Sequence, residues 1–142
     1  MDGALPEWVE GRRVRILDGN CLAATDHRLA VLQPYAAKAL PGKSLVVLEP
    51  ALQLATHVIP CLDGHAQERS LFTSVLDIAE PGDVWIADRN MGTLKFLFAL
   101  QQAQADFVIR QHGTPAWEAL ADLEYRGETT TGQVWEQPIR LH

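Results

Sequence analysis

The 142-residue sequence predicts an α/β domain built on a mixed sheet, with the element order β-β-β-α-β-α-β. Two observations predict it. Three short apolar segments, each closed by turn residues, come first and suit an antiparallel meander. The apolar period then changes to three and four, and helices alternate with strands. The chain has the length of one domain, and 47% hydrophobic residues should give it a core, which excludes a wholly disordered chain.

Three strands are expected at the start, after a lead-in over residues 1–12. The first begins at Arg13, alternates between two faces and is expected to stop at Asp18-Gly19-Asn20. The second and third are expected over Ser44–Leu48 and Ala55–Cys61, where β-branched and apolar residues end in turn residues. The short connections suit antiparallel pairing.

Helices and strands should alternate in the next part of the chain. Apolar residues recur at three and four over residues 66–80, which predicts an amphipathic helix. Asp83–Asp88 has the pattern of a strand, and Thr93 is a plausible N-cap of a second helix. Asp106–Arg110 is expected to form the next strand.

The last segment, Glu124–Arg140, has the pattern of a β-hairpin. Thr131-Gly132 should supply the turn, and Ile139 should belong to the returning strand. We therefore expect a core over residues 13–122, followed by the start of a hairpin segment over residues 123–142.

The charge balance argues against a protein that holds DNA by itself. Eighteen acidic residues against 12 basic ones give a net charge of −6, whereas nucleic-acid binders usually have a basic surface. No apolar stretch approaches the roughly 20 residues of a membrane-spanning helix, and the N-terminus lacks the pattern of a signal peptide. Cys21 and Cys61 form no zinc pattern, so we expect two thiols in a reducing, cytoplasmic setting.

Two of the expected strands end in an aspartate. Val14-x-Ile16-x-Asp18 and Val84-x-Ile86-x-Asp88 each carry an apolar stripe into a carboxylate on the same face. If these strands are neighbours, the carboxylates converge at one edge of the sheet, and their repulsion favours a divalent metal such as Mg²⁺ or Mn²⁺. The alternative is turn chemistry, in which each aspartate caps the backbone of a turn or a helix entry.

Four segments resemble the DDE transposases of bacterial insertion sequences, in the order in which that family carries them: Gly42-Lys43-Ser44-Leu45-Val46-Val47, Asp63-Gly64-His65-Ala66-Gln67-Glu68-Arg69-Ser70-Leu71, Trp85-Ile86-Ala87-Asp88-Arg89-Asn90 and Phe107-Val108-Ile109-Arg110-Gln111-His112. The resemblance extends from about Val14 to Arg140, and the most similar group carries a Tyr-x2-Arg-x3-Glu-x6-Lys motif around its third acid. It implies a ribonuclease H-like fold, with the hairpin segment as the start of an inserted β segment.

Transferred by position, the resemblance implies that Asp18 is the first catalytic aspartate and Asp88 the second. Both would be ligands of Mg²⁺ or Mn²⁺ in two-metal phosphoryl transfer, the chemistry of DNA cleavage and strand transfer at double-stranded transposon ends. Candidates for DNA contact are Arg89, Asn90, Arg110 and His112. The alternatives are a helix cap for the first two and an ordinary surface position for the last two.

The family's third acid has no match in the sequence. The glutamates of the last segment lack the motif's context, and Tyr125-Arg126-x-Glu128 has the right residue types at the wrong spacing. We therefore expect a truncated catalytic core that is inactive by itself. The alternatives are a decayed or domesticated non-catalytic ribonuclease H-like interaction module, and a metal-dependent nuclease outside transposition. Whether the chain forms a homo-oligomer stays open.

Overall fold

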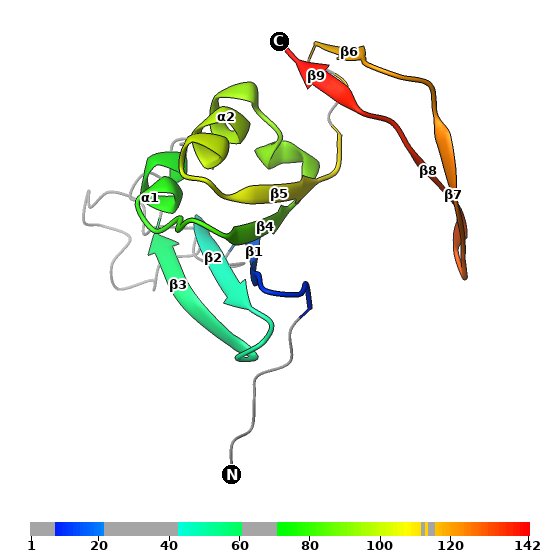
Figure 1. Cartoon of the computed structure of the whole chain (residues 1–142). Coiled ribbons are helices and arrows are strands. Elements are labelled where there is room, and N and C mark those ends of the chain that lie inside the picture. Colours follow the sequence, from blue (N-terminus) through cyan, green and yellow to red (C-terminus); the bar gives the residue numbers. More distant parts are fainter. Residues whose placement is uncertain (1–7, 22–42, 61–70, 112, 114–115) are drawn as a thin grey trace, which may run out of the picture. The chain divides into compact units, whose positions relative to one another are not determined.

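A computed structural model describes residues 8–21, 43–60, 71–111, 113 and 116–142. The chain divides into two units, Met1–Arg110 and Gln111–His142, and each is described by itself. The first unit is a mixed α/β structure, in which the described residues form one five-stranded sheet and few helices (Figure 1). The expected element order, β-β-β-α-β-α-β, is confirmed for the described residues of this unit.

The sheet of the first unit has five strands in the order β3-β2-β1-β4-β5. β1, β2 and β3 pair antiparallel as the expected meander, and β4 and β5 extend the sheet in parallel on the other side of β1. The strand bounds are β1 Arg13–Cys21, β2 Lys43–Glu49, β3 Leu54–Pro60, β4 Asp83–Ala87 and β5 Asp106–Ile109. The order places the first strand in the centre, between an antiparallel and a parallel neighbour.

The first strand runs further than the sequence predicts. Asp18-Gly19-Asn20 does not end it, because Gly19 and Asn20 continue the antiparallel ladder opposite Leu45 and Ser44. Turn-forming residues are tolerated in this stretch because a neighbouring strand supplies their backbone partners. Asp18 therefore lies inside β1 and not in a turn.

The first helix is shorter at its C-terminal end than the predicted range 66–80. α1 spans Phe72–Leu76, and residues 66–70 lie outside the described part of the chain. The N–H groups of Ile78 and Ala79 donate to carbonyls three residues back, which tightens the chain after the helix. The Ile78 carbonyl then accepts a 2.8 Å hydrogen bond from the Arg15 guanidinium of β1, so a contact with a distant strand determines this end.

The second helix begins where the sequence predicts. α2 spans Leu94–Gln102, and the Thr93 hydroxyl accepts a 3.4 Å hydrogen bond from the Phe96 N–H, which confirms Thr93 as the N-cap. A short 3-10 helix, η3 Arg89–Met91, separates β4 from this cap.

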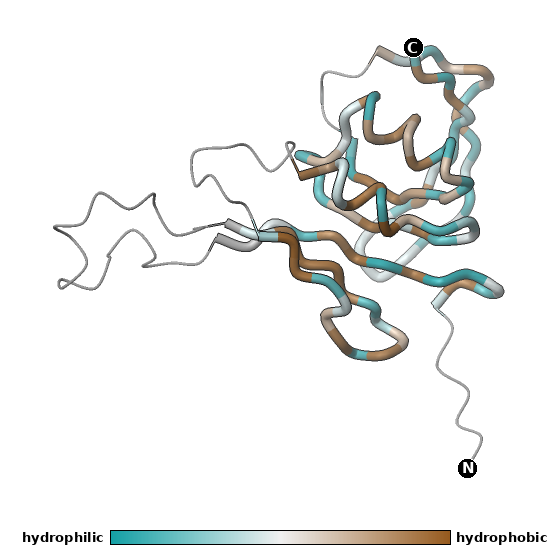
Figure 2. The backbone as a smooth tube through the Cα atoms, turned by 90° about the vertical axis from the view of Figure 1, so that its left-hand side faces the viewer, coloured by the Kyte–Doolittle hydropathy of each residue, from teal (hydrophilic) through white to brown (hydrophobic). Residues whose placement is uncertain are grey.

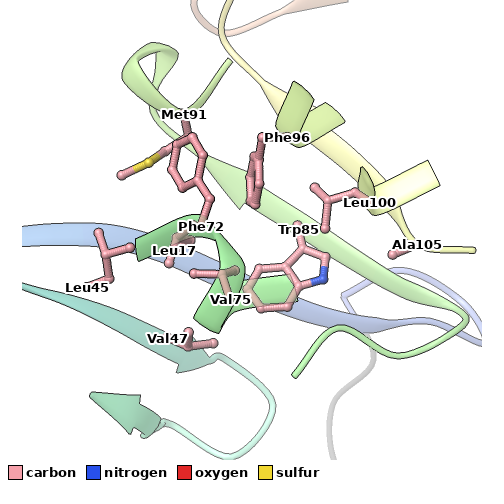
Figure 3. Close-up of a cluster of buried hydrophobic side chains, with 10 residues drawn as sticks. All are labelled: Leu17, Leu45, Val47, Phe72, Val75, Trp85, Met91, Phe96, Leu100 and Ala105. Carbon is pink, nitrogen blue, oxygen red and sulfur yellow. The ribbon is translucent and has the colours of Figure 1, made fainter. Parts of the chain in front are cut away.

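Both helices pack on one side of the sheet, and the core lies between them and the strands (Figures 1 and 3). Phe72 of α1 stacks on Phe96 of α2 with ring centroids 4.4 Å apart. Apolar residues recur along the strands and α2, as Figure 2 shows. The buried cluster consists of Leu17, Leu45, Val47, Phe72, Val75, Trp85, Met91, Phe96, Leu100 and Ala105.

The helix-covered face of β1 is not the face whose apolar stripe leads into Asp18. Leu17 and Arg15 point into the helix-covered side, and both are almost fully buried. On the opposite face Val14 is buried, but Ile16 is only half-buried. Asp18 thus belongs to the face away from α1 and α2.

A buried ion pair holds β1 against β4 on the helix side. Arg15 and Asp83 each expose 2% of their side chains, and Arg15 Nε lies 3.1 Å from Asp83 Oδ2, close enough for an ion pair but not aligned as a hydrogen bond. The guanidinium also lies 5.3 Å from the centroid of the buried Trp85 ring, a cation–π contact. Burial raises the pKa of Asp83, and this outweighs the lowering by a backbone N–H and by the Arg15 charge.

The second unit consists of two small antiparallel sheets. β7 Glu124–Thr129 and β8 Gly132–Glu136 form the expected hairpin, but the turn lies at residues 130–131 and not at Thr131-Gly132, because Gly132 already pairs with Thr129. The assignment of Ile139 to the same returning strand is wrong, because β9 Ile139–Leu141 pairs with an unexpected strand, β6 Trp117–Ala119. The returning strand breaks at Pro138, which has no N–H to donate to a ladder.

No helix in the described ranges has both the length and the apolar character that crossing a membrane would require.

Replacing Arg15 by methionine is expected to lower the free energy of unfolding at pH 7 by about 3–5 kcal/mol, because Asp83 stays buried without its cation. A carboxyl group whose pKa is raised by folding contributes its stability below its unfolded-state pKa, and this contribution is lost as the pH rises through the folded-state pKa. The deficit of Arg15→Met should therefore shrink at acid pH, where Asp83 takes a proton. Urea unfolding followed by circular dichroism at several pH values measures it.

The double variant Arg15→Met/Asp83→Asn should recover a large part of this loss, because neither charge is then left alone. Arg12→Met is the matched control, since Arg12 forms an exposed ion pair with Asp106 and its removal should cost no more than about 1 kcal/mol. A deficit of Arg15→Met that is the same at every pH would contradict the role assigned to Asp83.

Candidate functional site

The parallel pairing of β1 and β4 brings Asp18 and Asp88 to the same edge of the sheet. The last paired residues are Leu17 and Ala87, and each aspartate directly follows one of them. Neighbouring strands lie about 4.7–4.9 Å apart, so the two aspartates lie side by side where the pairing of β1 with β4 ends, Asp18 within β1 and Asp88 directly after β4. The two carboxylates are expected to converge if their strands are neighbours, and β1 and β4 are neighbours.

Both carboxylates also belong to the same face. Ile16 pairs with Ile86 in register, and side chains alternate along each strand, so the residues two positions later share that face. This is the face away from α1 and α2. Asp88 leaves β4 in an extended conformation, with φ −70° and ψ 162°, and so continues the direction of the strand.

Asp18 borders a shallow hollow on this face. The hollow has a volume of about 330 Å³ and is lined by Ile16, Asp18, Val46 and Leu48 of β1 and β2. Asp18 pairs with Val46 and Ile16 with Leu48 in the antiparallel ladder, so the floor is formed by backbone-paired residues. The carboxylate is exposed at one end of an otherwise apolar depression.

Asp88 stands at the entry to η3, but its side chain does not cap that helix. The backbone carbonyl of Asp88 accepts a 3.0 Å hydrogen bond from the Met91 N–H, whereas the carboxylate makes no capping bond. Oδ1 of Asp88 instead lies 3.4 Å from Nη2 of Arg110, and both side chains are about half exposed or more. The helix-cap alternative therefore does not describe the Asp88 carboxylate.

The candidate DNA-contacting residues have different surroundings. Arg110 directly follows β5, and because Ala87 pairs with Ile109 it lies at the same level as Asp88 on the adjacent strand. Arg89 and Asn90 belong to η3 and are exposed beside Asp88. His112 lies outside the described residues. Arg110 is thus the candidate that the structure links directly to an aspartate.

Two residues position the loop that contains Asp88, although the sequence alone assigns neither of them a role. Met91 is 2% exposed and anchors the loop in the core. Gly92 brings the loop against the end of β5, where an added Cβ would lie 3.1 Å from the Arg89 carbonyl oxygen and 3.4 Å from the Ile109 side chain. Only the pairing of distant strands reveals this close approach, so no local signal marks Gly92.

The donor set fits a hydrated hard cation. Two adjacent, exposed carboxylates offer oxygen ligands, and Mg²⁺ is commonly held by one or two carboxylates while it keeps several waters. In the described ranges no three His, Cys, Asp or Glu side chains gather as a metal cluster would require. Asp18 and Asp88 would therefore supply the protein ligands from this part of the chain.

Three of the four glutamates of the second unit form ion pairs within that unit. Arg126 bridges Glu124 and Glu136 across the hairpin, and Arg140 pairs with Glu118 between β6 and β9. All four glutamates of this unit are exposed, and Glu128 accepts a 3.4 Å hydrogen bond from Gln133.

Comparison with models of known protein families finds no match for the chain, and a search of curated proteins likewise finds none.

The substitution Gly92→Ala is expected to lower the free energy of unfolding by about 1–2 kcal/mol, because the new methyl group crowds the loop backbone at 3.1 Å and must displace it. Gly113→Ala is the matched control, since a Cβ there meets nothing within 4 Å. Chemical denaturation of the two variants measures the difference, and equal stability would contradict the close packing of the Asp88 loop on β5.

Proposed function

We propose that this chain is part of the catalytic core of a DDE transposase, with a ribonuclease H-like fold and a divalent-metal site at Asp18 and Asp88. The observation that carries the proposal is the position of these two aspartates directly after the last paired residues of the parallel ladder between β1 and β4. The resemblance to that family implies the same two residues: Asp88 lies in one of the four similar segments, and Asp18 is matched by its place on the first strand. A mixed sheet with an antiparallel meander followed by parallel strands is compatible with the fold that the resemblance implies.

The chemistry proposed for this edge is phosphoryl transfer. When bound, Mg²⁺ or Mn²⁺ would activate a water molecule or a DNA 3′-hydroxyl as the nucleophile and would neutralise charge on the leaving oxygen. Asp18 and Asp88 would hold the cation from two rigid strands, and their exposure would admit a phosphodiester of double-stranded DNA. Arg89 and Arg110 lie beside Asp88 along the chain and along the sheet, and they would contact DNA phosphate oxygens.

A non-catalytic ribonuclease H-like module is the second candidate, and the ion pair between Asp88 and Arg110 favours it. A carboxylate already neutralised by a guanidinium is a weaker metal ligand, and the described residues bring only two carboxylates together at this edge. Such a module would keep the sheet as a binding scaffold without chemistry. Metal binding that depends on Asp18 and Asp88 separates the two candidates.

We expect Mn²⁺ to bind the chain, and the substitutions Asp18→Asn and Asp88→Asn each to weaken this binding at least about tenfold, because each removes one charged oxygen ligand. Isothermal titration calorimetry measures the affinity, and the double variant should show no binding above background. Asp106→Asn is the control, since it removes an exposed aspartate from the opposite end of β5. Affinity that survives the double substitution would rule out the paired-carboxylate site and leave the non-catalytic module.

The chain by itself is not expected to cut or join DNA. None of its glutamates has the Tyr-x2-Arg-x3-Glu context of the family's third acid, so the metal would be held by an incomplete ligand set. Incubation of the purified chain with supercoiled plasmid and Mg²⁺ or Mn²⁺, analysed on an agarose gel, should leave the plasmid intact. Strand transfer or nicking that disappears in Asp18→Asn would show that two carboxylates suffice.

A further inference from the structure

We propose that Arg110 is a built-in counter-ion of Asp88, which occupies the carboxylate in the absence of a metal and must be displaced for the metal to bind. This inference rests on the proposed metal site. It assigns Arg110 the role of a positioning residue that regulates access to Asp88, in addition to any contact with DNA.

The register of the sheet places the three charges in one row. Asp18 follows Leu17 on β1, Asp88 follows Ala87 on β4, and Arg110 follows Ile109 on β5. These strands are consecutive neighbours in the sheet. A cation between the two carboxylates would therefore have the guanidinium of Arg110 as its next neighbour along the same edge.

The ion pair has the properties of an exchangeable contact. Nη2 of Arg110 lies 3.4 Å from Oδ1 of Asp88, longer than the roughly 2.7–2.9 Å of a strong charge-assisted hydrogen bond. The side chains of Arg110 and Asp88 are 69% and 48% exposed. Exposed pairs of this kind contribute little to stability, so folding does not require this one.

At the opposite edge of the same sheet, where the parallel strands begin, several ion pairs are shorter than that of Arg110 with Asp88. There Arg13 reaches Glu49 and Glu80 at 2.9 Å, and Arg15 pairs with the buried Asp83 at 3.1 Å. Among the described residues of the first unit, the pair of Arg110 and Asp88 is the ion pair at the carboxyl edge of the parallel strands. The network of charges that stabilises the sheet thus lies away from the proposed metal site.

Removing the guanidinium should strengthen metal binding for two reasons. It frees an oxygen of Asp88, and it removes a positive charge from the vicinity of the bound cation. We expect Arg110→Ala to bind Mn²⁺ about three- to tenfold more tightly than the wild type, the scale of one exposed ion pair plus one nearby like charge. Arg110→Lys keeps a positive charge and should stay within about twofold of the wild type.

The experiment is a calorimetric Mn²⁺ titration of the full chain, with a double-mutant cycle. The gain from Arg110→Ala should disappear in the Asp88→Asn background, because there is then no carboxylate for the guanidinium to occupy. Arg12→Ala is the matched control: it also removes one arginine from an exposed pair with an aspartate, at the other end of β5, and should leave the affinity unchanged.

The outcomes distinguish this inference from the proposed function. If wild type binds Mn²⁺ through Asp18 and Asp88 but Arg110→Ala binds no more tightly, the metal site stands and the role of Arg110 is wrong. An equal gain in Arg12→Ala would mean a general charge effect and would also overturn it. If neither wild type nor Arg110→Ala shows binding that depends on Asp88, both the metal site and the counter-ion role are refuted.

Discussion

The parallel pairing of β1 with β4 is the contact on which the rest of the first unit depends. It joins the antiparallel meander to the parallel strands, and its register decides which residues meet at each edge. The buried Arg15 helps to specify that register, because its partner Asp83 and its stacking partner Trp85 both lie on β4. A slip by one residue would turn Arg15 toward the opposite face and separate the two aspartates. The same pairing that buries a charge therefore brings two exposed carboxylates, Asp18 and Asp88, next to one another.

The two ends of the parallel strands differ in how their charged side chains are paired. At the edge where the parallel strands begin, short ion pairs connect β1 to β2 and to the segment between α1 and β4. At the edge where they end, the carboxylates are exposed and only one has a long ion pair within the described residues. Rigid elements place the candidate ligands, while Met91 and Gly92 fix the loop that leaves β4. A site on strand ends needs this support, because ligand geometry depends on the backbone beneath it.

The sequence predicts elements well where the signal is local and fails where distant segments decide. The alternating strands and the Thr93 cap are confirmed, because period and capping chemistry lie within a few residues. The expected stop at Asp18-Gly19-Asn20 is wrong because β2 supplies ladder partners, and α1 ends early because Ile78 meets Arg15. The pairing of β6 with β9 joins residues 20 to 24 positions apart, which no local pattern indicates. For the site, both aspartates could be predicted as carboxylates that continue the apolar stripe of a strand, but Arg110 as the partner of Asp88 required the order of the strands.

The acidic composition of the chain takes on a specific meaning at this edge. A net charge of −6 opposes DNA binding over the surface as a whole. Locally, the carboxylates of Asp18 and Asp88 are balanced by the guanidiniums of Arg110 and Arg89, so these four side chains carry no net charge. Under the proposed function, a bound divalent cation would make this edge positive, and the guanidinium released from Asp88 would be free to contact a phosphate. Under the proposed function, this edge would therefore attract a DNA phosphate more strongly with the metal bound than without it, because the cation adds two positive charges to a neutral group of side chains.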